Sequence, residues 1–355
     1  MKILLTGGGT AGHIMPHLAL LNDIKKNFDQ ITYIGGKGGM EKSIIEKQKS
    51  IVYHEIPTTK FVRKKLFKNL LIPFKLIRSV SESKKIIKSE KPDVVFSKGG
   101  YVSLPVVIAS KRLKVPVVAH ESDLKMGLAN KLSKPFVKVI CTSFEKTAQN
   151  CKKAIWTGSP MREDMLTSKQ DAMKKLQIVT SKPILVITGG SLGSQFINHK
   201  IREDIRDLTK DFYVIHLTGK NNVDSSLNNI HDYKQIDFTL DMGCILSCAD
   251  IVVSRAGSNT IFELAVMRKP MLLIPLPKGN SRGDQVDNAK YFNAKGFANF
   301  VTQQQLENEH IYKFINQTFK HKDSLIKNLQ NSDIESGNKK ILDIIIKEAN
   351  QKTKS

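Results

Sequence analysis

Residues 3–20 read ILLTGGGTAGHIMPHLAL, and this stretch decides how the chain begins to fold. A short apolar run, residues 3–5, leads through three consecutive glycines to a helix-forming segment that starts beside His13. A strand that turns tightly into a helix points backbone N–H groups outward, and the helix N-terminus favours negative charge. The stretch therefore predicts a parallel α/β sheet with an anion-binding turn at the carboxyl end of its first strand.

The same strand–glycine–helix pattern occurs twice more. Residues 94–103 read VVFSKGGYVS, and residues 184–194 read ILVITGGSLGS. Turns of this kind in both halves of a chain are typical of nucleotide-type domains, whose ligands bind at the carboxyl ends of the strands. We therefore predict an α/β fold of two Rossmann-like domains that face each other across a cleft, with the site in that cleft.

Apolar runs of strand length, separated by helix-length segments, mark the expected strands. They are residues 3–5, 31–34, 94–96, 115–119, 137–141, 184–188, 212–217, 251–254 and 271–276. A glycine–proline linker signal lies at residues 156–160. We expect an N-terminal domain over residues 1–160 and a C-terminal domain over residues 161–334, with a last helix near 335–350 that packs back on the first domain.

The opening turn fits the pattern G-x-G-x-x-G at Gly7, Gly9 and Gly12, which is typical of dinucleotide binding. A nicotinamide enzyme also needs an acidic residue at the end of the second strand, to hold ribose hydroxyls. Here that strand runs into the glycine-rich residues 35–39, and the first acid, Glu41, belongs to the next helix. No lysine follows the last of the three turns to make a Walker loop. Nicotinamide-dependent enzymes and proteins with a Walker phosphate-binding loop are therefore both disfavoured.

The composition adds a constraint on partners. The 355-residue chain has ordinary hydrophobic (40%) and charged (25%) content but a formal net charge of +23. That excess implies nucleic acid, an anionic membrane surface or a phosphorylated substrate, and no RNA- or DNA-binding motif accompanies it. The four cysteines lack metal-ligand spacing and are expected to be buried thiols. With no signal-peptide pattern and no run of roughly 18 apolar residues, we expect a soluble or membrane-surface protein.

Residues 61–91 read FVRKKLFKNLLIPFKLIRSVSESKKIIKSEK, with ten Lys or Arg and two Glu among apolar side chains. This mixture is typical of an interfacial segment, whose apolar face enters the headgroups while lysines meet anionic lipid. The alternative is a core-facing amphipathic helix with a solvated basic side, and Ile86 and Ile87 are expected to face the core. We predict an anionic membrane surface as one partner.

Eight motifs occur in order between about residues 3 and 300: GGGTAGH, SKGGYVSLPVVIA, HESDLKMGLANK, GSPMRED, GGSLGS, HLTGK, SRAGSNTIFELA and SRGDQVDNA. Together they resemble the MurG-type glycosyltransferases. The resemblance implies a GT-B fold and inverting transfer of N-acetylglucosamine from UDP-N-acetylglucosamine to the C4 hydroxyl of the N-acetylmuramic acid of lipid I, giving lipid II and UDP. It also implies a role in peptidoglycan synthesis, and hence in cell shape and division, for a peripheral protein on the cytoplasmic side of the cell membrane.

Other functions stay open at this point. A different sugar-nucleotide enzyme of the same fold, such as a diacylglycerol glucosyltransferase or a UDP-N-acetylglucosamine 2-epimerase, is one alternative. The stretches GGYVSLP and HESD on the acceptor side disfavour the epimerase. A basic nucleic-acid-binding protein is the other alternative, and the glycine turns together with Glu263 disfavour it.

The resemblance implies that the C-terminal domain binds the donor. The strand-to-helix turn after residue 254 would offer the N–H groups of Ser258, Asn259 and Thr260 to the diphosphate. Glu263, one helical turn beyond Asn259, would accept hydrogen bonds from ribose hydroxyls. The alternative role for Glu263 is to stabilise the N-terminus of its own helix. The other implied donor residues are Ser191 at the phosphates, Arg162 and Arg255 near the nucleotide, Met242 over the uracil, and Asp284 and Gln285 at the sugar.

The N-terminal domain would hold lipid I. The resemblance places its diphosphate and reacting sugar against the first turn, including Thr10 and Gly12, with His13 near the acceptor hydroxyl. An imidazole is well suited to remove that proton at neutral pH. The alternative base is a carboxylate of residues 120–123, and Asp123 is expected to bind the acceptor. No Asp-x-Asp motif follows a strand, so we expect no metal ion and no cofactor: backbone N–H groups and a helix dipole can stabilise the leaving UDP.

Overall fold

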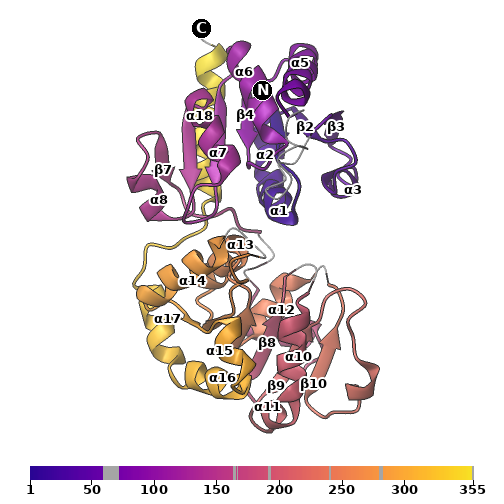
Figure 1. Cartoon of the computed structure of the whole chain (residues 1–355), viewed down its shortest axis with the longest axis vertical. Helices are drawn as coiled ribbons and strands as arrows, with labels where there is room; N and C mark the ends of the chain where they lie inside the picture. The colour runs from indigo at the N-terminus through magenta and orange to yellow at the C-terminus, as the bar shows by residue number, and fades with distance from the viewer. Residues whose placement is uncertain are drawn as a thin grey trace. The chain divides into compact units, whose positions relative to one another are not determined.

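The computed structural model describes residues 1–58, 72–162, 165, 167–190, 193–239, 241–279 and 283–353. The chain forms two compact units (Figure 1). The first unit comprises Met1–Met161 and Ser336–Ser355, and the second comprises Arg162–Glu335. Each unit is a parallel sheet flanked by helices, as alternating strand and helix segments predict.

The sheet of the first unit has the strand order β3-β2-β1-β4-β5-β6-β7, and every neighbouring pair is parallel. Its strands are β1 (Lys2–Thr6), β2 (Gln30–Gly36), β3 (Ile51–Ile56), β4 (Val94–Ser97), β5 (Val117–Glu121), β6 (Val139–Thr142) and β7 (Ala154–Trp156). Its helices are α1 (Ala11–Ala19), α2 (Leu21–Asn27), α3 (Glu41–Ile45), α5 (Ile72–Glu90), α6 (Ser103–Arg112), α7 (Leu128–Ser133), α8 (Glu145–Gln149) and α18 (Asn338–Thr353).

Side chains of β1 alternate between two cores, because successive residues of a strand point to opposite faces. Ile3 and Leu5 pack with α1, α2 and α18 on one face, whereas Leu4 packs with α5 and α6 on the other. Helix α18 contributes Ile341 and Ile345 to the first of these cores, so the end of the chain completes the unit in which the chain begins. Figure 1 shows this helix, in yellow, among the indigo and magenta elements of the first unit.

The sheet of the second unit has the order β10-β9-β8-β11-β12-β13, again with parallel neighbours. Its strands are β8 (Ile184–Thr188), β9 (Tyr213–Leu217), β10 (Tyr233–Ile236), β11 (Ile251–Ser254), β12 (Met271–Leu273) and β13 (Asn299–Phe300). Its helices are α9 (Lys169–Lys175), α10 (Gln195–Glu203), α11 (Ile205–Asp211), α12 (Met242–Cys248), α13 (Ser258–Val266), α14 (Asp284–Ala294), α15 (Gln303–Glu307), α16 (Ile311–Lys320) and α17 (Lys322–Gln330).

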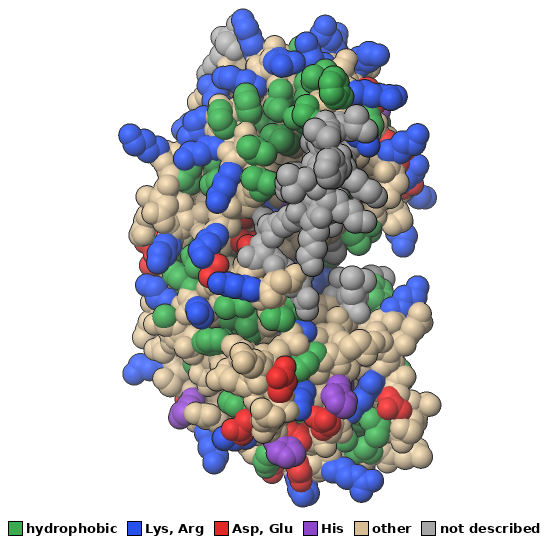
Figure 2. Space-filling view, viewed as in Figure 1, with side chains coloured by type: hydrophobic (Ala, Val, Ile, Leu, Met, Phe, Trp, Pro, Cys, Tyr) green, Lys and Arg blue, Asp and Glu red, His purple; other side chains and the backbone are tan. Residues whose placement is uncertain are grey.

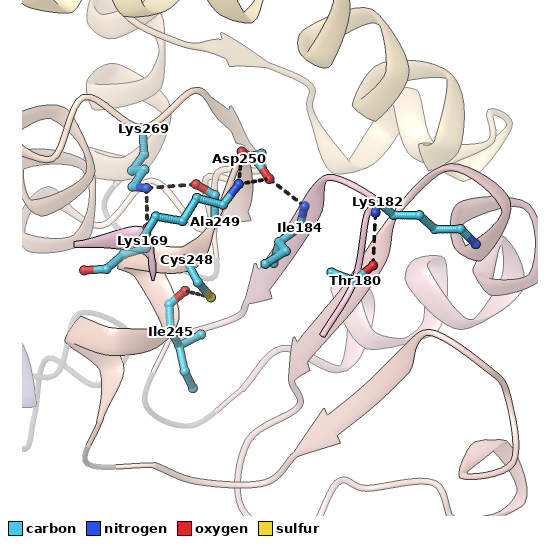
Figure 3. Close-up of polar contacts among 10 residues, drawn as sticks. Lys169, Thr180, Lys182, Ile184, Ile245, Cys248, Ala249, Asp250 and Lys269 are labelled. Atoms are coloured by element: carbon cyan, nitrogen blue, oxygen red, sulfur yellow. Dashed lines mark hydrogen bonds and ion pairs between the residues drawn. The ribbon is translucent and has the colours of Figure 1, made fainter. Parts of the chain in front are cut away.

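Charged groups fasten the amino ends of β8 and β11 (Figure 3). The carboxylate of Asp250 accepts a hydrogen bond from the N–H group of Ile184 at 2.8 Å and pairs with the ammonium of Lys169 at 2.6 Å. The ammonium of Lys269 donates to the carbonyls of Ser247 and Ala249, at 2.6 and 2.9 Å. These hydrogen bonds and ion pairs hold the amino ends of β8 and β11 in place. The glycine turns follow the opposite, carboxyl ends of the same strands.

Strand order locates the expected ligand sites. In the first sheet the chain runs outward from β1 to β2 and β3 and then returns, so that β4 lies on the other side of β1. The second sheet repeats this reversal between β8 and β11. Ligands of parallel α/β sheets bind at the carboxyl ends of strands beside such a reversal. The turns after β1 and β4, and those after β8 and β11, therefore meet at the two switch points.

All four cysteines are buried and none forms a disulfide, which confirms the prediction of buried thiols. Among the residues that the structure describes, no helix is long and apolar enough to cross a membrane. The same residues contain no group of three or more His, Cys, Asp and Glu side chains placed to hold a metal ion.

Candidate active site

The turn after β1 brings two of the predicted acceptor residues together. Gly9 adopts the left-handed conformation, with φ of 86°, and Thr10 is the extended N-cap residue of α1. The Thr10 side chain does not cap the helix; its Oγ1 atom lies 2.9 Å from Nδ1 of the half-buried His13. Gly12 lies in the same first turn of α1. The threonine hydroxyl therefore contacts the imidazole at Nδ1 and helps to orient the ring.

The turn after β4 lies directly against the turn after β1. A Cβ atom on Gly100 would collide with the carbonyl oxygen of Gly8 and would lie 3.3 Å from Nδ1 of His13. A Cβ atom on Gly9 would collide with the ring of Tyr101. Both glycines of the second turn, Gly99 and Gly100, have positive φ. Glycine is required here because two backbone segments approach closely at the switch point.

The loop after β5 is folded around a buried carboxylate. The two Glu121 oxygens accept hydrogen bonds from the N–H groups of Asp123 and Gly127 and from the Asn130 amide, at 3.0, 2.8 and 2.9 Å. Burial raises the pKa of Glu121, and the nearby Asp123 adds to the shift. Glu121 is therefore engaged by the protein, whereas Asp123 is half-buried at the start of the loop. Of the two carboxylates in residues 120–123, Asp123 is the better placed to meet an acceptor.

His120 is also held by the protein. Its Nδ1 atom accepts a hydrogen bond from the ammonium of Lys98 at 2.6 Å, and its Nε2 lies 3.3 Å from the carbonyl of Gly158. Lys98 donates to Ser122 as well. Burial and the neighbouring ammonium keep the pKa of His120 well below the usual value, and burial lowers the pKa of Lys98 to about 8. His120 is thus a neutral, buried imidazole that supports the loop, and His13 is the better candidate for the base.

In the second unit, the turn after β11 has the geometry of a phosphate site. Helix α13 begins at Ser258, and its N-cap, Gly257, has no side chain to cap it. Apart from its two chain neighbours, no atom of the described residues lies within 4 Å of a Cβ atom built on Gly257, so the described part of the chain leaves the space beside this turn open. The same holds beside Gly190 in the turn after β8. The first N–H groups of a helix have no intrahelical acceptor, so Ser258, Asn259 and Thr260 begin a helix end suited to an anion.

Glu263 lies one turn further along α13, where 18% of its side chain is exposed. Its Oε1 atom is 4.0 Å from Nε of Arg162, so these two predicted residues lie close together. Asn288 of α14 donates to the carbonyl of Ala256 at 3.3 Å and ties α14 to the same turn. A helix end suited to phosphate, a carboxylate beyond it and a guanidinium nearby fit a nucleotide diphosphate.

Arg255 is held by partners within its own unit. Its guanidinium donates to Oγ of Ser194 at 2.7 Å, to the carbonyl of Ile274 at 3.1 Å and to Oε1 of Gln303 at 3.0 Å. Burial lowers the pKa of Arg255 to about 10, so it stays charged at neutral pH. These contacts tie the turn after β8 to the end of β12. A direct substrate contact by Arg255 stays a prediction, and its contacts within the protein do not support it.

The remaining predicted donor residues lie at helix starts. Met242 begins α12 and is half-buried, and Asp284 begins α14 after Gly283, whose φ is 86°. The Oε1 atom of Gln285 accepts from the N–H group of Leu276 at 3.0 Å, so its amide NH₂ group is the part suited to a sugar oxygen. Ser191 lies outside the described residues.

The chain matches both domains of one known protein family. The N-terminal domain of glycosyltransferase family 28 matches residues 3–142, and the C-terminal domain of that family matches residues 184–345. The chain is 43% identical over 350 residues to a protein of Clostridium tetani, covering 98% of each, and 44% identical over 353 residues to one of Clostridium novyi, again covering 98% of each. Both relatives are named UDP-N-acetylglucosamine–N-acetylmuramyl-(pentapeptide) pyrophosphoryl-undecaprenol N-acetylglucosamine transferase.

Solved structures show the same fold. The MurG structure of Acinetobacter baumannii superposes with a TM-score of 0.76 at 23% identity and covers 98% of this chain and 99% of that one. The UDP-N-acetylglucosamine 2-epimerase of Neisseria meningitidis, bound to UDP-N-acetylglucosamine, has a TM-score of 0.67 at 16% identity and covers 99% and 100%. The predicted fold class, two Rossmann-like units of the GT-B glycosyltransferase type, is confirmed. The chain belongs to glycosyltransferase family 28, as its MurG-type motifs indicated.

Proposed function

We propose that this protein transfers N-acetylglucosamine from UDP-N-acetylglucosamine to the C4 hydroxyl of the N-acetylmuramic acid of lipid I, with inversion, and releases lipid II and UDP. The observation that carries the proposal is the open helix end at Gly257, with Glu263 on the same helix, in a chain 43% identical to transferases named for this reaction. The first unit supplies the acceptor side, and the second unit supplies the donor side.

The donor side acts by binding and by stabilising charge. The diphosphate lies against the N–H groups at the start of α13, and Glu263 accepts hydrogen bonds from the ribose hydroxyls. When the bond between the anomeric carbon and the diphosphate oxygen breaks, negative charge builds up on UDP. The partial positive charge of the helix N-terminus stabilises this charge without reorganising, which lowers the barrier.

The acceptor side removes a proton. His13 accepts the proton of the sugar hydroxyl at Nε2 while that oxygen attacks the anomeric carbon from the face opposite UDP. For this step Nδ1 must carry a hydrogen, which it donates to Oγ1 of Thr10 over the 2.9 Å contact. Asp123 binds the acceptor at the edge of the loop that Glu121 holds in shape.

The exposed start of α5 supports contact with a membrane. Phe74 and Ile77 are 72% and 67% exposed, beside the exposed Lys75 and Arg78. Further along the helix, Val80 and Ile87 are buried, and Ile86 packs against the same core, as expected for Ile86 and Ile87. The predicted interfacial segment therefore has two described parts, both in α5: an apolar and basic exposed surface at the start of the helix, and a core-facing surface toward its end. Residues 61–71 of the segment lie outside the described part of the chain. Figure 2 shows Lys and Arg side chains spread over the first unit, with hydrophobic side chains between them.

The test is transfer of radiolabelled sugar from UDP-N-acetylglucosamine to a short-chain lipid I analogue, with UDP-glucose as the competing donor and diacylglycerol as the competing acceptor. We expect a disaccharide product only from UDP-N-acetylglucosamine and the lipid I analogue. Transfer to diacylglycerol alone, or conversion of the donor to its 2-epimer without any acceptor, would contradict the proposal.

A further inference from the structure

The glycine-rich residues 35–39 have no role in the chemistry described so far. They connect β2 to α3, whose first residue, Glu41, is completely buried. A buried carboxylate is costly unless hydrogen bonds satisfy it. The partners of Glu41 therefore show what this segment is for.

Both oxygens of Glu41 accept hydrogen bonds from the backbone. Oε1 accepts from the N–H group of Gly36 at 2.8 Å, at the end of β2. Oε2 accepts from the N–H group of Gly9 at 3.3 Å, in the turn that precedes α1. One carboxylate thus links the end of the second strand to the first glycine turn, which lies 32 residues earlier in the chain.

Glycines on both segments make room for this carboxylate. A Cβ atom on Gly8 would lie 2.5 Å from Oε1 of Glu41, and one on Gly35 would lie 2.9 Å from its Cγ. A Cβ atom on Gly39 would collide with the carboxyl group itself, because its three nearest atoms all belong to Glu41. The Glu41 side chain is thus the nearest obstacle to a Cβ atom at Gly8 and Gly39, whereas at Gly35 the hydroxyl of Tyr53 lies closer.

The hydrogen bond to Gly9 acts on the residues proposed to carry out proton transfer. Gly9 holds the left-handed conformation immediately before Thr10, and Thr10 contacts the His13 ring. A carboxylate bound to the Gly9 N–H group fixes the peptide plane between Gly8 and Gly9 and so the direction in which the chain enters α1. It also gives this N–H group a protein partner, so an acceptor diphosphate must use other donors of the turn.

We propose that Glu41 is a positioning residue of the acceptor side, whose buried carboxylate fixes the turn that carries Thr10 and His13. This inference rests on the proposed function. Glu41 is too deeply buried to touch a substrate, so it acts through the turn and takes no proton from the acceptor.

The first test is Glu41→Gln, which keeps the shape of the side chain. A glutamine has one acceptor oxygen and one donor NH₂ group, so in either orientation its NH₂ group faces one of the two backbone N–H groups. We expect kcat to fall on the order of 10- to 100-fold, because small displacements of a catalytic group are costly. Amide hydrogen exchange in residues 7–14 should become at least about tenfold faster, while the Kd for UDP, bound by the other unit, stays unchanged.

The matched control is Glu46→Gln, at the C-cap of the same short helix, where 51% of the side chain is exposed. It should leave kcat and exchange at wild-type values. Unchanged kcat together with unchanged exchange in Glu41→Gln would overturn the proposal. A loss of activity with equally faster exchange in all parts of the first unit would also overturn it, because that pattern indicates general destabilisation.

A second variant, Gly39→Ala, keeps the carboxylate but displaces it. Gly39→Ala should also lower kcat and accelerate amide hydrogen exchange in residues 7–14. If Glu41→Gln does not fold, Gly39→Ala is by itself the test of the proposal. In a Glu41→Ala background, where the colliding atoms are gone, the additional effect of Gly39→Ala should shrink to less than about twofold. Normal kcat and exchange in Gly39→Ala would overturn the inference. Failure of the proposed function is distinct from both results, since the unmodified protein would then transfer no sugar to lipid I.

Discussion

The Nδ1 atom of His13 lies 2.9 Å from the Oγ1 atom of Thr10, within the first turn of α1. The contact sets the chemistry of the ring. If Nδ1 carries the hydrogen and donates to the hydroxyl, Nε2 has a lone pair and can act as a base. The two residues are three positions apart in the chain, so the geometry depends on the start of α1 and on the turn that Gly9 makes.

Replacement of His13 by alanine should lower kcat for transfer by a factor of about 10²–10⁴, because the reaction loses the proposed general base. The Kd for UDP, measured by calorimetry, should not change, since we propose that the nucleotide binds the other unit. His199→Ala is the matched control, because this histidine is on the exposed side of α10 with 72% of its side chain accessible. Turnover of His13→Ala near the wild-type value would remove His13 from this role.

Gly257→Ala should leave the stability of the protein unchanged but weaken the binding of the donor. The backbone of Gly257 is extended, with φ of −68° and ψ of 131°, and a Cβ atom there would have no atom of the described residues within 4 Å beyond its chain neighbours. The melting temperature should therefore stay within about 1 °C of wild type. The methyl group would occupy the space in which we place the diphosphate, so the affinity for UDP should fall at least about tenfold, or 1.4 kcal/mol. Unchanged UDP affinity would show that the diphosphate binds elsewhere.

Glu263 should discriminate ribose from deoxyribose. A carboxylate that accepts hydrogen bonds from ribose hydroxyls contributes about 1.5–3 kcal/mol. The wild-type protein should therefore bind UDP roughly 10- to 100-fold more tightly than 2′-deoxy-UDP. In Glu263→Ala, both nucleotides should bind with equal, weaker affinity. A variant that keeps the preference for UDP would show that Glu263 only stabilises its helix.

Charged substitutions at the start of α5 should impair membrane binding and spare catalysis. The double variant Phe74→Glu, Ile77→Glu removes apolar surface and adds repulsion toward anionic lipid. Sedimentation with phosphatidylglycerol vesicles should fall at least about tenfold, while transfer to a detergent-soluble, short-chain acceptor stays normal. Val179→Glu is the matched control, because Val179 is 96% exposed in the second unit. Equal vesicle binding by all three proteins would contradict a membrane role for α5.

Acid should destabilise the second unit through His216. This buried imidazole contacts the Tyr233 hydroxyl at 2.8 Å and Oδ1 of Asn198 at 3.0 Å, and burial lowers its pKa to about 3. The unfolded chain, with a histidine pKa near 6.5, binds the extra proton between these two values. The stabilising effect is therefore complete above about pH 6.5 and is lost as the pH falls toward 3, by up to about 1.4 kcal/mol per pH unit.

The measurement is the free energy of unfolding in urea at several pH values between 5 and 7.5. Between pH 6.5 and 5, the free energy of unfolding should decline less steeply in His216→Gln than in wild type, by the slope that corresponds to the uptake of about one proton on unfolding. The variant should nevertheless be less stable than wild type at every pH. An identical slope in both proteins would contradict the assignment. His199→Gln, at an exposed position, should keep the wild-type slope.

The central strands could be predicted from the sequence, and the edge strands could not. Strands β1, β4, β8 and β11 are buried on both faces and therefore occur as short apolar runs. The strands missed by the prediction are β3, β7, β10 and β13, and each forms an edge of its sheet. An edge strand is partly exposed and mixes polar with apolar residues, as in YKQI of β10, so hydrophobicity does not mark it. The linker predicted at residues 156–160 begins one residue early for the same reason, since Trp156 ends β7.

By itself, the sequence determined the order of the inner strands and the glycine turns, the family, and the stretches that carry the motifs, because these depend on local residue patterns. Only the tertiary structure decided what each polar group faces. It gave the Arg255 guanidinium, the Glu121 carboxylate and the His120 imidazole partners within the protein, and it turned Glu41 inward to the Gly9 N–H group. These contacts join distant parts of the chain: Glu41 and Gly9 are 32 positions apart, and Arg255 and Ser194 are 61 positions apart. No local pattern reports them, because they arise only when parallel strands bring distant turns to one edge of a sheet.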